Sequence, residues 1–187
     1  VRDGFALKGR WREALMPGAR EVHVELGCGK GRFTAGTAAE HPDVLFIAIE
    51  KVPDALVVAM ERAMELELKN VFFLVGDAAL LPDYFDGGEV DLIYINFCDP
   101  WPPRGQAKRR LTHRGFLETY RKVLRPGGQI HFKTDNQPLF EFSLLEFPAA
   151  GYELSEVTRN LHGEGPRGVM TDYEAKFFAG GLPINRC

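Results

Sequence analysis

The sequence predicts an α/β protein with one mostly parallel β-sheet and helices on both of its faces. Apolar strand-like runs alternate with helical patterns along most of the chain, as expected for a parallel sheet. Polar motifs follow the predicted strands at their carboxyl ends, where open α/β sheets bind ligands. The chain of 187 residues is long enough to bury a substantial core, so we expect a single domain over residues 1–187.

The elements follow from periodicity and from the turn residues that bound each run. Strands are predicted at Glu21–Leu26, Val44–Ile49, Val71–Val75, Val90–Phe97 and Gln129–Lys133. Helices are predicted between and after them, at Arg32–Glu40, Pro53–Leu68, Thr112–Leu124 and Pro138–Ala150. Two late strands, Tyr152–Arg159 and Lys176–Ala179, bring the expected sheet to about seven strands.

Composition excludes several classes of protein. Hydrophobic residues make up 45% of the chain and charged residues 26%, which is ordinary for a soluble globular protein. No apolar run approaches the ~20 residues of a membrane-spanning helix, and charges at Lys8 and Arg10 argue against a signal peptide. Cys28, Cys98 and Cys187 have no metal-ligand spacing, which predicts reduced thiols in a cytoplasmic protein without a metal site. A start at Val1 is compatible with a trimmed chain, and residues 1–20 form a short N-terminal segment.

Positive charge is concentrated in one part of a chain whose net charge is −3. Between Pro102 and Arg125 a single acid, Glu118, stands among the basic residues Arg104, Lys108, Arg109, Arg110, Arg114, Arg121, Lys122 and Arg125. A solvated helix face is the simplest explanation of such a run. The motif Asp99-Pro100-Trp101-Pro102 directly before it has the composition of a pocket rim, which favours a contact with nucleic-acid phosphates.

A glycine-rich loop, Glu25-Leu26-Gly27-Cys28-Gly29-Lys30-Gly31, joins the first predicted strand to the first helix. A tight turn alone would explain Gly27, Gly29 and Gly31. The spacing matches neither the dinucleotide fingerprint nor the P-loop. In this chain an acid precedes a G-x-G-x-G pattern. This arrangement resembles the S-adenosylmethionine loop of class I methyltransferases.

Two further acids follow the next strands. Glu50, at the end of the second strand, has the position of a carboxylate that accepts both ribose hydroxyls of a nucleotide. Asp77, at the end of the third strand, has the position of an acid that meets the adenine amino group. Either residue alone could be a helix cap, but acids at three successive strand ends favour a nucleoside-like cofactor.

Four motifs in collinear order carry a more specific resemblance. They are Asn96–Pro102, Lys108–Thr112, Pro126–Asn136 and Thr171–Phe177. Together they resemble the bacterial tRNA (guanine-N7)-methyltransferase family over nearly the whole chain. The resemblance implies a class I methyltransferase (Rossmann-like) fold and S-adenosylmethionine as cofactor. It implies methyl transfer to N7 of a guanine in the variable loop of tRNA, in the cytoplasm, and leaves monomer and homodimer both open.

The resemblance also implies roles for particular residues. The residues expected on the cofactor side are Glu25, Gly27, Gly29, Gly31, Glu50, Asp77 and Asp99. Those expected to meet the target nucleotide are Asp135, Thr171, Asp172, Tyr173 and Glu174. Those expected to contact RNA are Arg104, Lys108, Arg109 and Arg110. The chain departs from the family at Pro103, where a lysine is usual, and in the shorter segment before Lys8–Trp11.

The chemistry of N7 methylation fits a carboxylate that is not a general base. N7 carries a lone pair and no proton, so it attacks the sulfonium methyl without losing one. A carboxylate can instead orient the ring and balance the positive charge of the product. Asp99 is the candidate catalytic residue and Asp135 a second candidate, against the simpler interpretations of a strand-end acid and a helix N-cap.

Two alternatives stay open at this point. Methylation of an exocyclic amine is one, because Asp-Pro-Trp-Pro is similar to the loop of amino-methyltransferases. A non-catalytic RNA-binding subunit is the other, because Pro103 cannot donate a hydrogen bond to a base. The loop spacing disfavours a nicotinamide-linked dehydrogenase.

Overall fold

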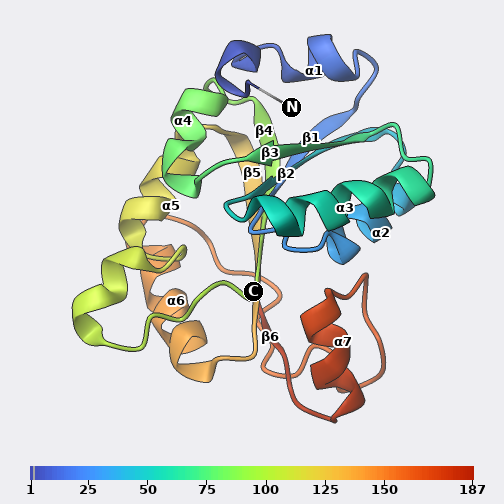
Figure 1. The fold of residues 1–187 in the computed structure, drawn as a ribbon. Coiled ribbons are helices and arrows are strands. Elements are labelled where there is room, and N and C mark those ends of the chain that lie inside the picture. Colours follow the sequence, from blue (N-terminus) through green and yellow to red (C-terminus); the bar gives the residue numbers. More distant parts are fainter. Residues whose placement is uncertain (2) are drawn as a thin grey trace.

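The computed structural model describes Val1 and residues 3–187, apart from the side chain of Arg104. These residues form one six-stranded sheet in the order β3-β2-β1-β4-β5-β6 (Figure 1). Its parallel strands are β1 (Glu21–Leu26), β2 (Val44–Glu50), β3 (Val71–Val75), β4 (Val90–Asn96) and β5 (Leu124–Thr134). The short β6 (Asn185–Arg186) pairs antiparallel with β5.

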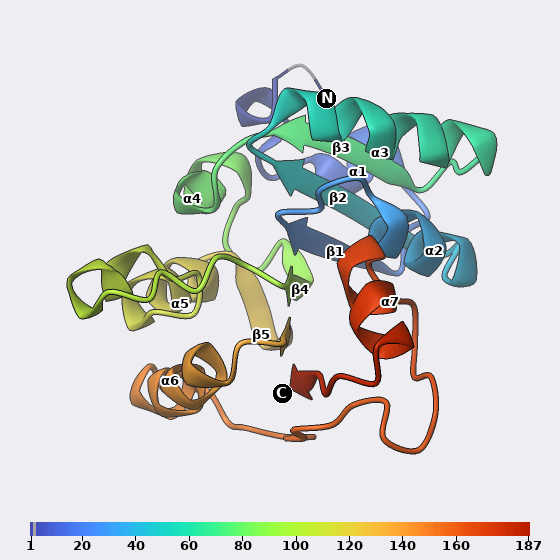
Figure 2. The same cartoon turned by 60° about the horizontal axis from the view of Figure 1, so that its bottom comes forward.

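Helices cover the sheet from both sides (Figure 2). One face carries α2 (Arg32–Glu40) and α3 (Pro53–Glu65), and the other carries α4 (Leu81–Tyr84), α5 (Arg114–Arg121) and α6 (Gln137–Ala149). The last helix, α7 (Asp172–Ala179), lies beside β6, while α1 (Trp11–Leu15) and a 3₁₀ turn, η1 (Phe5–Leu7), lie at the opposite end of the molecule. Two more 3₁₀ segments are η2 (Ala78–Leu80) and η3 (Arg104–Arg109).

The fold class is confirmed, and the differences are in the last third of the chain. The strand predicted at Lys176–Ala179 is wrong, because those residues belong to α7. The strand predicted at Tyr152–Arg159 is also wrong, since in the described structure only Thr158 makes an isolated bridge, to Arg186. The sheet therefore has six strands and not about seven. β5 begins earlier than the predicted strand Gln129–Lys133, because Arg125–Gly128 belong to it, at the shift in its register with β4.

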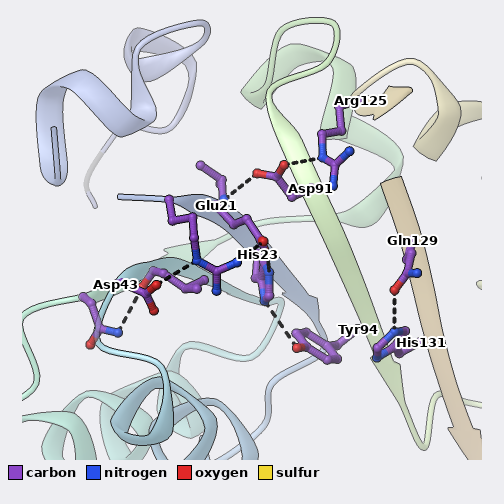
Figure 3. A network of polar contacts seen from close by, with 12 residues as sticks. Glu21, His23, Asp43, Asp91, Tyr94, Arg125, Gln129 and His131 are labelled. Carbon is purple, nitrogen blue, oxygen red and sulfur yellow. Dashed lines mark hydrogen bonds and ion pairs between the residues drawn. The ribbon is translucent and has the colours of Figure 1, made fainter. Parts of the chain in front are cut away.

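The two faces of the sheet differ in polarity. Toward α4, α5 and α6 the strands present fully buried apolar side chains such as Val24, Ile93 and Phe132. On the opposite face His23 and Tyr94 form a polar row with His131, in which the Tyr94 hydroxyl lies 3.3 Å from the Nδ1 of His23 (Figure 3). The larger apolar core lies on the α4–α6 face, and a second core under α2 and α3, with Phe46, Leu56 and Tyr94, covers the opposite face beside the polar row.

His131 is a histidine of β5 whose ring has a hydrogen-bond partner on the same strand. Its Nε2 lies 3.1 Å from the side-chain oxygen of Gln129, two residues earlier on β5 (Figure 3). Burial lowers the pKa of His131 to about 4, so the ring is neutral at physiological pH. A neutral, bonded imidazole on the face of the sheet has no part in the site at the carboxyl ends of the strands.

Candidate active site

Two cavities lie at the carboxyl ends of the parallel strands. The first, about 450 Å³, includes Ile49, Glu50 and Asp77 and is called here the β1–β3 cavity. The second, about 570 Å³, includes Phe33, Asp135 and Tyr173 and is called the α7 cavity. Both include Gly27 and the segment from Asn96 to Asp99. A ligand in each cavity would therefore meet the other across this shared wall.

The three loop glycines serve two different purposes. Gly27 and Gly29 have φ values of 75° and 52°, and a Cβ built at either position meets no atom within 4 Å. They leave the loop open for the close approach of a ligand. Gly31 also has a positive φ, but a Cβ there would come within 2.5 Å of the Cβ of Ala59. Gly31 therefore allows α2 to pack closely against α3.

Glu50 lines the β1–β3 cavity, and its carboxylate accepts backbone N–H groups from the glycine loop and from the two residues that follow it. One carboxylate oxygen accepts the N–H of Gly29 at 2.9 Å, and the other accepts the N–H groups of Lys51 and Val52 at 2.8 and 3.0 Å. These bonds orient the carboxylate and attach the glycine loop to the end of β2. A carboxylate has about four acceptor sites, so it can still accept a hydroxyl.

Asp77 lies across the same cavity and begins η2. Its side chain accepts the N–H of Ala79 at 2.9 Å and pairs with the ammonium of Lys51 at 2.8 Å. Partial burial opposes ionisation of Asp77, but Lys51 and the Ala79 N–H together hold its pKa below the ordinary value. Asp77 is thus both a cap and a charged wall of the cavity.

Glu25 forms part of the α7 cavity, and its residue is only 3% exposed. It accepts hydrogen bonds from the hydroxyl of Thr34 and, at 3.0 Å, from the side-chain amide of Asn96. Burial raises the pKa of Glu25 to about 7, although its hydrogen bonds with Thr34 and Asn96 and the nearby charge of Lys133 oppose the shift. Among the described residues the amide oxygen of Asn96 is buried without a partner. A cationic ligand would offset the charge of this carboxylate.

The loop after β4 carries Asp99 between the cavities. Phe97 and Trp101 are both left-handed, with φ values of 55° and 43°, which is uncommon for non-glycine residues. Asp99 is exposed and accepts no hydrogen bond from the residues that the structure describes. Its carboxylate is therefore available to a ligand in either cavity.

Asp135 faces the α7 cavity, and its neighbour caps the helix that follows. Asn136 is the N-cap of α6 and accepts the N–H of Leu139 at 2.8 Å. The half-buried Asp135 instead accepts a 3.3 Å hydrogen bond from the hydroxyl of Tyr173. The simpler interpretation of Asp135 as an N-cap is therefore wrong.

The wall opposite Asp99 is the first turn of α7. Thr171 and Glu174 form a capping box, in which each side chain accepts the backbone N–H of the other residue. Asp172 is bound by both terminal nitrogens of Arg62 on α3, at 2.7 and 3.2 Å. The ring of Tyr173 lies 5.2 Å from that of Phe97.

Glu174 lies behind this wall and does not line the cavity. It is fully buried and accepts hydrogen bonds from the Lys133 ammonium at 2.6 Å and the His162 Nε2 at 2.8 Å. Burial lowers the pKa of Lys133, although Glu174 opposes that shift. Lys133 and His162 were not predicted as site residues. The only signal was a lysine inside an apolar strand, since buried lysines are rare unless paired.

The basic residues after Asp99 are not equivalent. Lys108 and Arg109 are exposed at the β1–β3 cavity, and the guanidinium of Arg109 lies 3.4 Å from the centroid of the Trp101 ring. Arg110 is half-buried and bonds the backbone of the Asp99 loop. The predicted RNA contact by the Arg104 side chain lies outside the described part of the structure. Pro103 is the N-cap of η3, and its carbonyl accepts the N–H of Gln106 at 2.9 Å.

Across Val1 and residues 3–187 no group of three or more histidine, cysteine, aspartate or glutamate side chains could hold a metal ion. Among the same residues no helix has the length and apolar composition needed to cross a membrane. The three cysteines are free thiols, as predicted.

Comparison with known proteins assigns the family. A family model described as "Putative methyltransferase" matches residues 19–187. The tRNA (guanine-N(7)-)-methyltransferase of Lactococcus lactis subsp. cremoris (strain MG1363) is 47% identical over 189 residues, covering 100% of this chain and 87% of that protein. This chain belongs to the tRNA (guanine-N7)-methyltransferase family. The Clostridioides difficile (strain 630) member is 46% identical and covers 100% of this chain and 88% of its own length.

Solved structures agree with this family at the level of the fold. The 16S rRNA methyltransferase KamB superposes with a TM-score of 0.70 at 18% identity, over 93% of this chain and 89% of that one. A SAM-dependent methyltransferase from Aquifex aeolicus gives 0.58 at 18% identity, over 79% and 80%. The tRNA (guanine-N7)-methyltransferase family member described here therefore has the class I methyltransferase fold that the sequence predicts.

Proposed function

We propose that this chain transfers a methyl group from S-adenosylmethionine to N7 of a guanine in the variable loop of tRNA. The observation that carries this proposal is the meeting of two cavities at Asp99, one lined by strand-end acids and the other by α7. A methyl donor whose nucleoside lies in the first cavity, and whose cationic end reaches Glu25 in the second, would meet a base there beside the wall from Asn96 to Asp99. Membership of the tRNA (guanine-N7)-methyltransferase family supports the same reaction.

The residues of the first half of the chain fit S-adenosylmethionine. When bound, this cofactor supplies a methyl group on a positively charged sulfonium. Gly27 and Gly29 leave open space along the loop, and Glu25 offers a buried carboxylate to a cation. Glu50 and Asp77 lie at the ends of β2 and β3, where they would hold the ribose hydroxyls and the adenine amino group.

The residues of the second half would hold the guanine. Asp99 accepts no hydrogen bond from the described residues and lines both cavities, so it can accept N–H groups of the base and balance the charge that develops at N7. Asp135 and Tyr173 would meet the base from the other side. Thr171 and Asp172 line the cavity, while the buried Glu174 would act through the position of α7. The acceptor has no proton to lose, so alignment supplies much of the rate.

The exposed Lys108 and Arg109 would bind tRNA phosphates without reading the sequence. We propose the same for Arg104. We also propose a cytoplasmic location, which a tRNA substrate and the free cysteines support. One sheet carries both cavities, which supports a single domain over residues 1–187.

The test is incubation of the purified protein with labelled S-adenosylmethionine and unmodified tRNA, followed by nucleoside analysis. We expect label in 7-methylguanosine. Label in an N2-methylated guanosine would instead identify an exocyclic-amine methyltransferase. tRNA binding without any label would identify the protein as a non-catalytic RNA-binding subunit, which is the alternative based on Pro103.

A further inference from the structure

The loop that carries Asp99 needs an external support. It begins and ends at left-handed non-glycine residues, Phe97 and Trp101, and each such conformation costs about 1–3 kcal/mol unless the surroundings hold it. Pro100, Pro102 and Pro103 have no N–H, so this loop can be held through its backbone mainly by its carbonyl oxygens. A donor that reaches those oxygens would decide where Asp99 points.

Arg110 supplies that donor. Its Nε donates to the carbonyl of Pro100 at 2.9 Å and its Nη2 to the carbonyl of Trp101 at 3.0 Å. The guanidinium also lies 4.4 Å from the centroid of the Phe142 ring on α6. Two N–H groups in a planar fork bind two consecutive carbonyls in a geometry that a lysine ammonium does not reproduce.

The chain around Arg110 is itself fixed to the helices behind the loop. The carbonyl of Leu111 accepts a 2.8 Å hydrogen bond from the Tyr120 hydroxyl of α5. The hydroxyl of Thr112 lies 2.7 Å from that of Ser143 on α6, and both side chains are buried. Arg110 therefore connects the Asp99 loop to a rigid part of the molecule.

The neighbouring basic residues lack these contacts. Lys108 and Arg109 are exposed, and among the described residues Arg109 lies over the ring of Trp101 and donates to the side chain of Gln106 within η3. The run Lys108-Arg109-Arg110 thus contains two side chains free to meet phosphate and one already bound to the loop.

We propose that Arg110 is a positioning residue for Asp99, and that it supports the orientation of the carboxylate and not the binding of tRNA. This inference rests on the proposed methyl transfer, because Asp99 is assigned its role there. It separates two functions within one basic run: phosphate contact by the exposed side chains, and alignment of the Asp99 loop by the half-buried guanidinium of Arg110.

The decisive variant is Arg110→Lys, which keeps the positive charge and removes the fork. Arg121→Lys is the matched control, because Arg121 also donates to a carbonyl, that of Ala150, and lies over an aromatic ring, that of Tyr152, away from both cavities. For both variants we would measure kcat at saturating tRNA, the Kd for tRNA by filter binding, and acrylamide quenching of tryptophan fluorescence. Quenching reports on Trp101, since Trp11 is fully buried.

We expect Arg110→Lys to lower kcat at least tenfold, to leave the Kd for tRNA within twofold, and to increase quenching. Arg121→Lys should change none of the three by more than twofold. A Kd for tRNA that rises tenfold in Arg110→Lys with kcat retained would overturn the proposal and return Arg110 to the RNA contacts. Unchanged kcat and unchanged quenching would also overturn it. Failure of the wild-type protein to methylate tRNA would count against the proposed function alone, because quenching still tests the support of the loop.

Discussion

The two cavities are held together by different kinds of contact. Around the β1–β3 cavity the acids bind backbone N–H groups nearby in sequence: Glu50 reaches back to Gly29, 21 residues away, and Asp77 bonds Ala79. The wall of the α7 cavity depends on side-chain pairs from distant segments, with 110 residues between Arg62 and Asp172 and 41 between Lys133 and Glu174. The cofactor side is therefore local to the strand ends, whereas the acceptor side exists only when the last third of the chain has docked.

Asp99 belongs to both cavities, so its replacement tests the point at which they meet. We expect Asp99→Ala to lower kcat by about 10²–10³-fold, as removal of a group that stabilises developing charge typically does. The free energy of unfolding should change by less than about 0.5 kcal/mol, because Asp99 is exposed and unbonded among the described residues. Label transfer and urea unfolding measure the two effects.

The exposed Asp83 on α4 provides the control, and Asp83→Ala should transfer methyl at the wild-type rate. Near wild-type turnover of Asp99→Ala would remove Asp99 from the mechanism and leave the shared wall without a catalytic residue.

We expect Glu174→Gln to displace the α7 wall of the acceptor side without changing how the cofactor side binds S-adenosylmethionine. Loss of the buried charge leaves Lys133 without its ion-pair partner, which should reduce the free energy of unfolding by about 3–5 kcal/mol. Displacement of the α7 wall should lower kcat/KM for tRNA by roughly 10²-fold, since alignment of the acceptor is lost. The Kd for S-adenosylmethionine, measured calorimetrically at a temperature where the variant is folded, should stay within twofold.

Glu164→Gln is the matched control, because Glu164 is exposed and pairs with Arg167 at 2.7 Å on the surface. It should change the free energy of unfolding by less than about 1 kcal/mol. An equal loss of cofactor affinity in Glu174→Gln would show that the two cavities are not independently supported.

The raised pKa of Glu25 predicts a pH dependence on the cofactor side. Burial raises this pKa to about 7, while Lys133 and the bonded Thr34 and Asn96 oppose the shift. Below pH 7 the free protein holds Glu25 neutral, so affinity for the cationic cofactor should rise up to tenfold per pH unit and level off above pH 7. Titrations between about pH 5.5 and 7.5 would measure this, and Glu25→Gln should flatten the profile.

The same group affects the stability of the free protein with the opposite sign. A carboxyl whose pKa is raised by folding contributes stability that is fully present below its unfolded pKa of 4.5 and is lost as pH rises through about 7. Glu25→Gln should remove that loss from the pH profile of urea unfolding. A wild-type cofactor affinity that does not change with pH would contradict the assignment of Glu25 to the cation.

The smallest effect is expected at the exposed rim. Replacing Lys108 and Arg109 together by alanine should weaken tRNA binding several-fold. It should also reduce the slope of log K against log salt by about 0.7–0.9 for each phosphate that the variant no longer neutralises. Affinity for S-adenosylmethionine measures whether these two side chains also belong to the cofactor side, since both line the β1–β3 cavity. An unchanged salt slope would exclude them as phosphate-binding residues.

Several misplaced elements had a signal in the sequence. The apolar residues of Lys176–Ala179 favour a strand, but Thr171 and Glu174 three positions later form a capping-box pattern that predicts a helix. Asn136, and not Asp135, caps α6, because the side-chain oxygen of Asn136 accepts the N–H of Leu139. The sequence of Tyr152–Arg159 alternates like that of a strand and carries no comparable signal against one. In the structure this segment makes a single isolated bridge to Arg186.

The sequence by itself determined the order of the parallel strands along the chain and the placement of Glu25, Glu50, Asp77 and Asp99. Parallel strands end at the same edge of a sheet. Residues that follow correctly predicted strands therefore lie close together at that edge. Only the tertiary structure decided that Glu174 is buried against Lys133, that Arg62 holds Asp172, and that Arg110 supports the Asp99 loop. Those partners depend on how distant segments pack in three dimensions, which local periodicity and spacing do not encode.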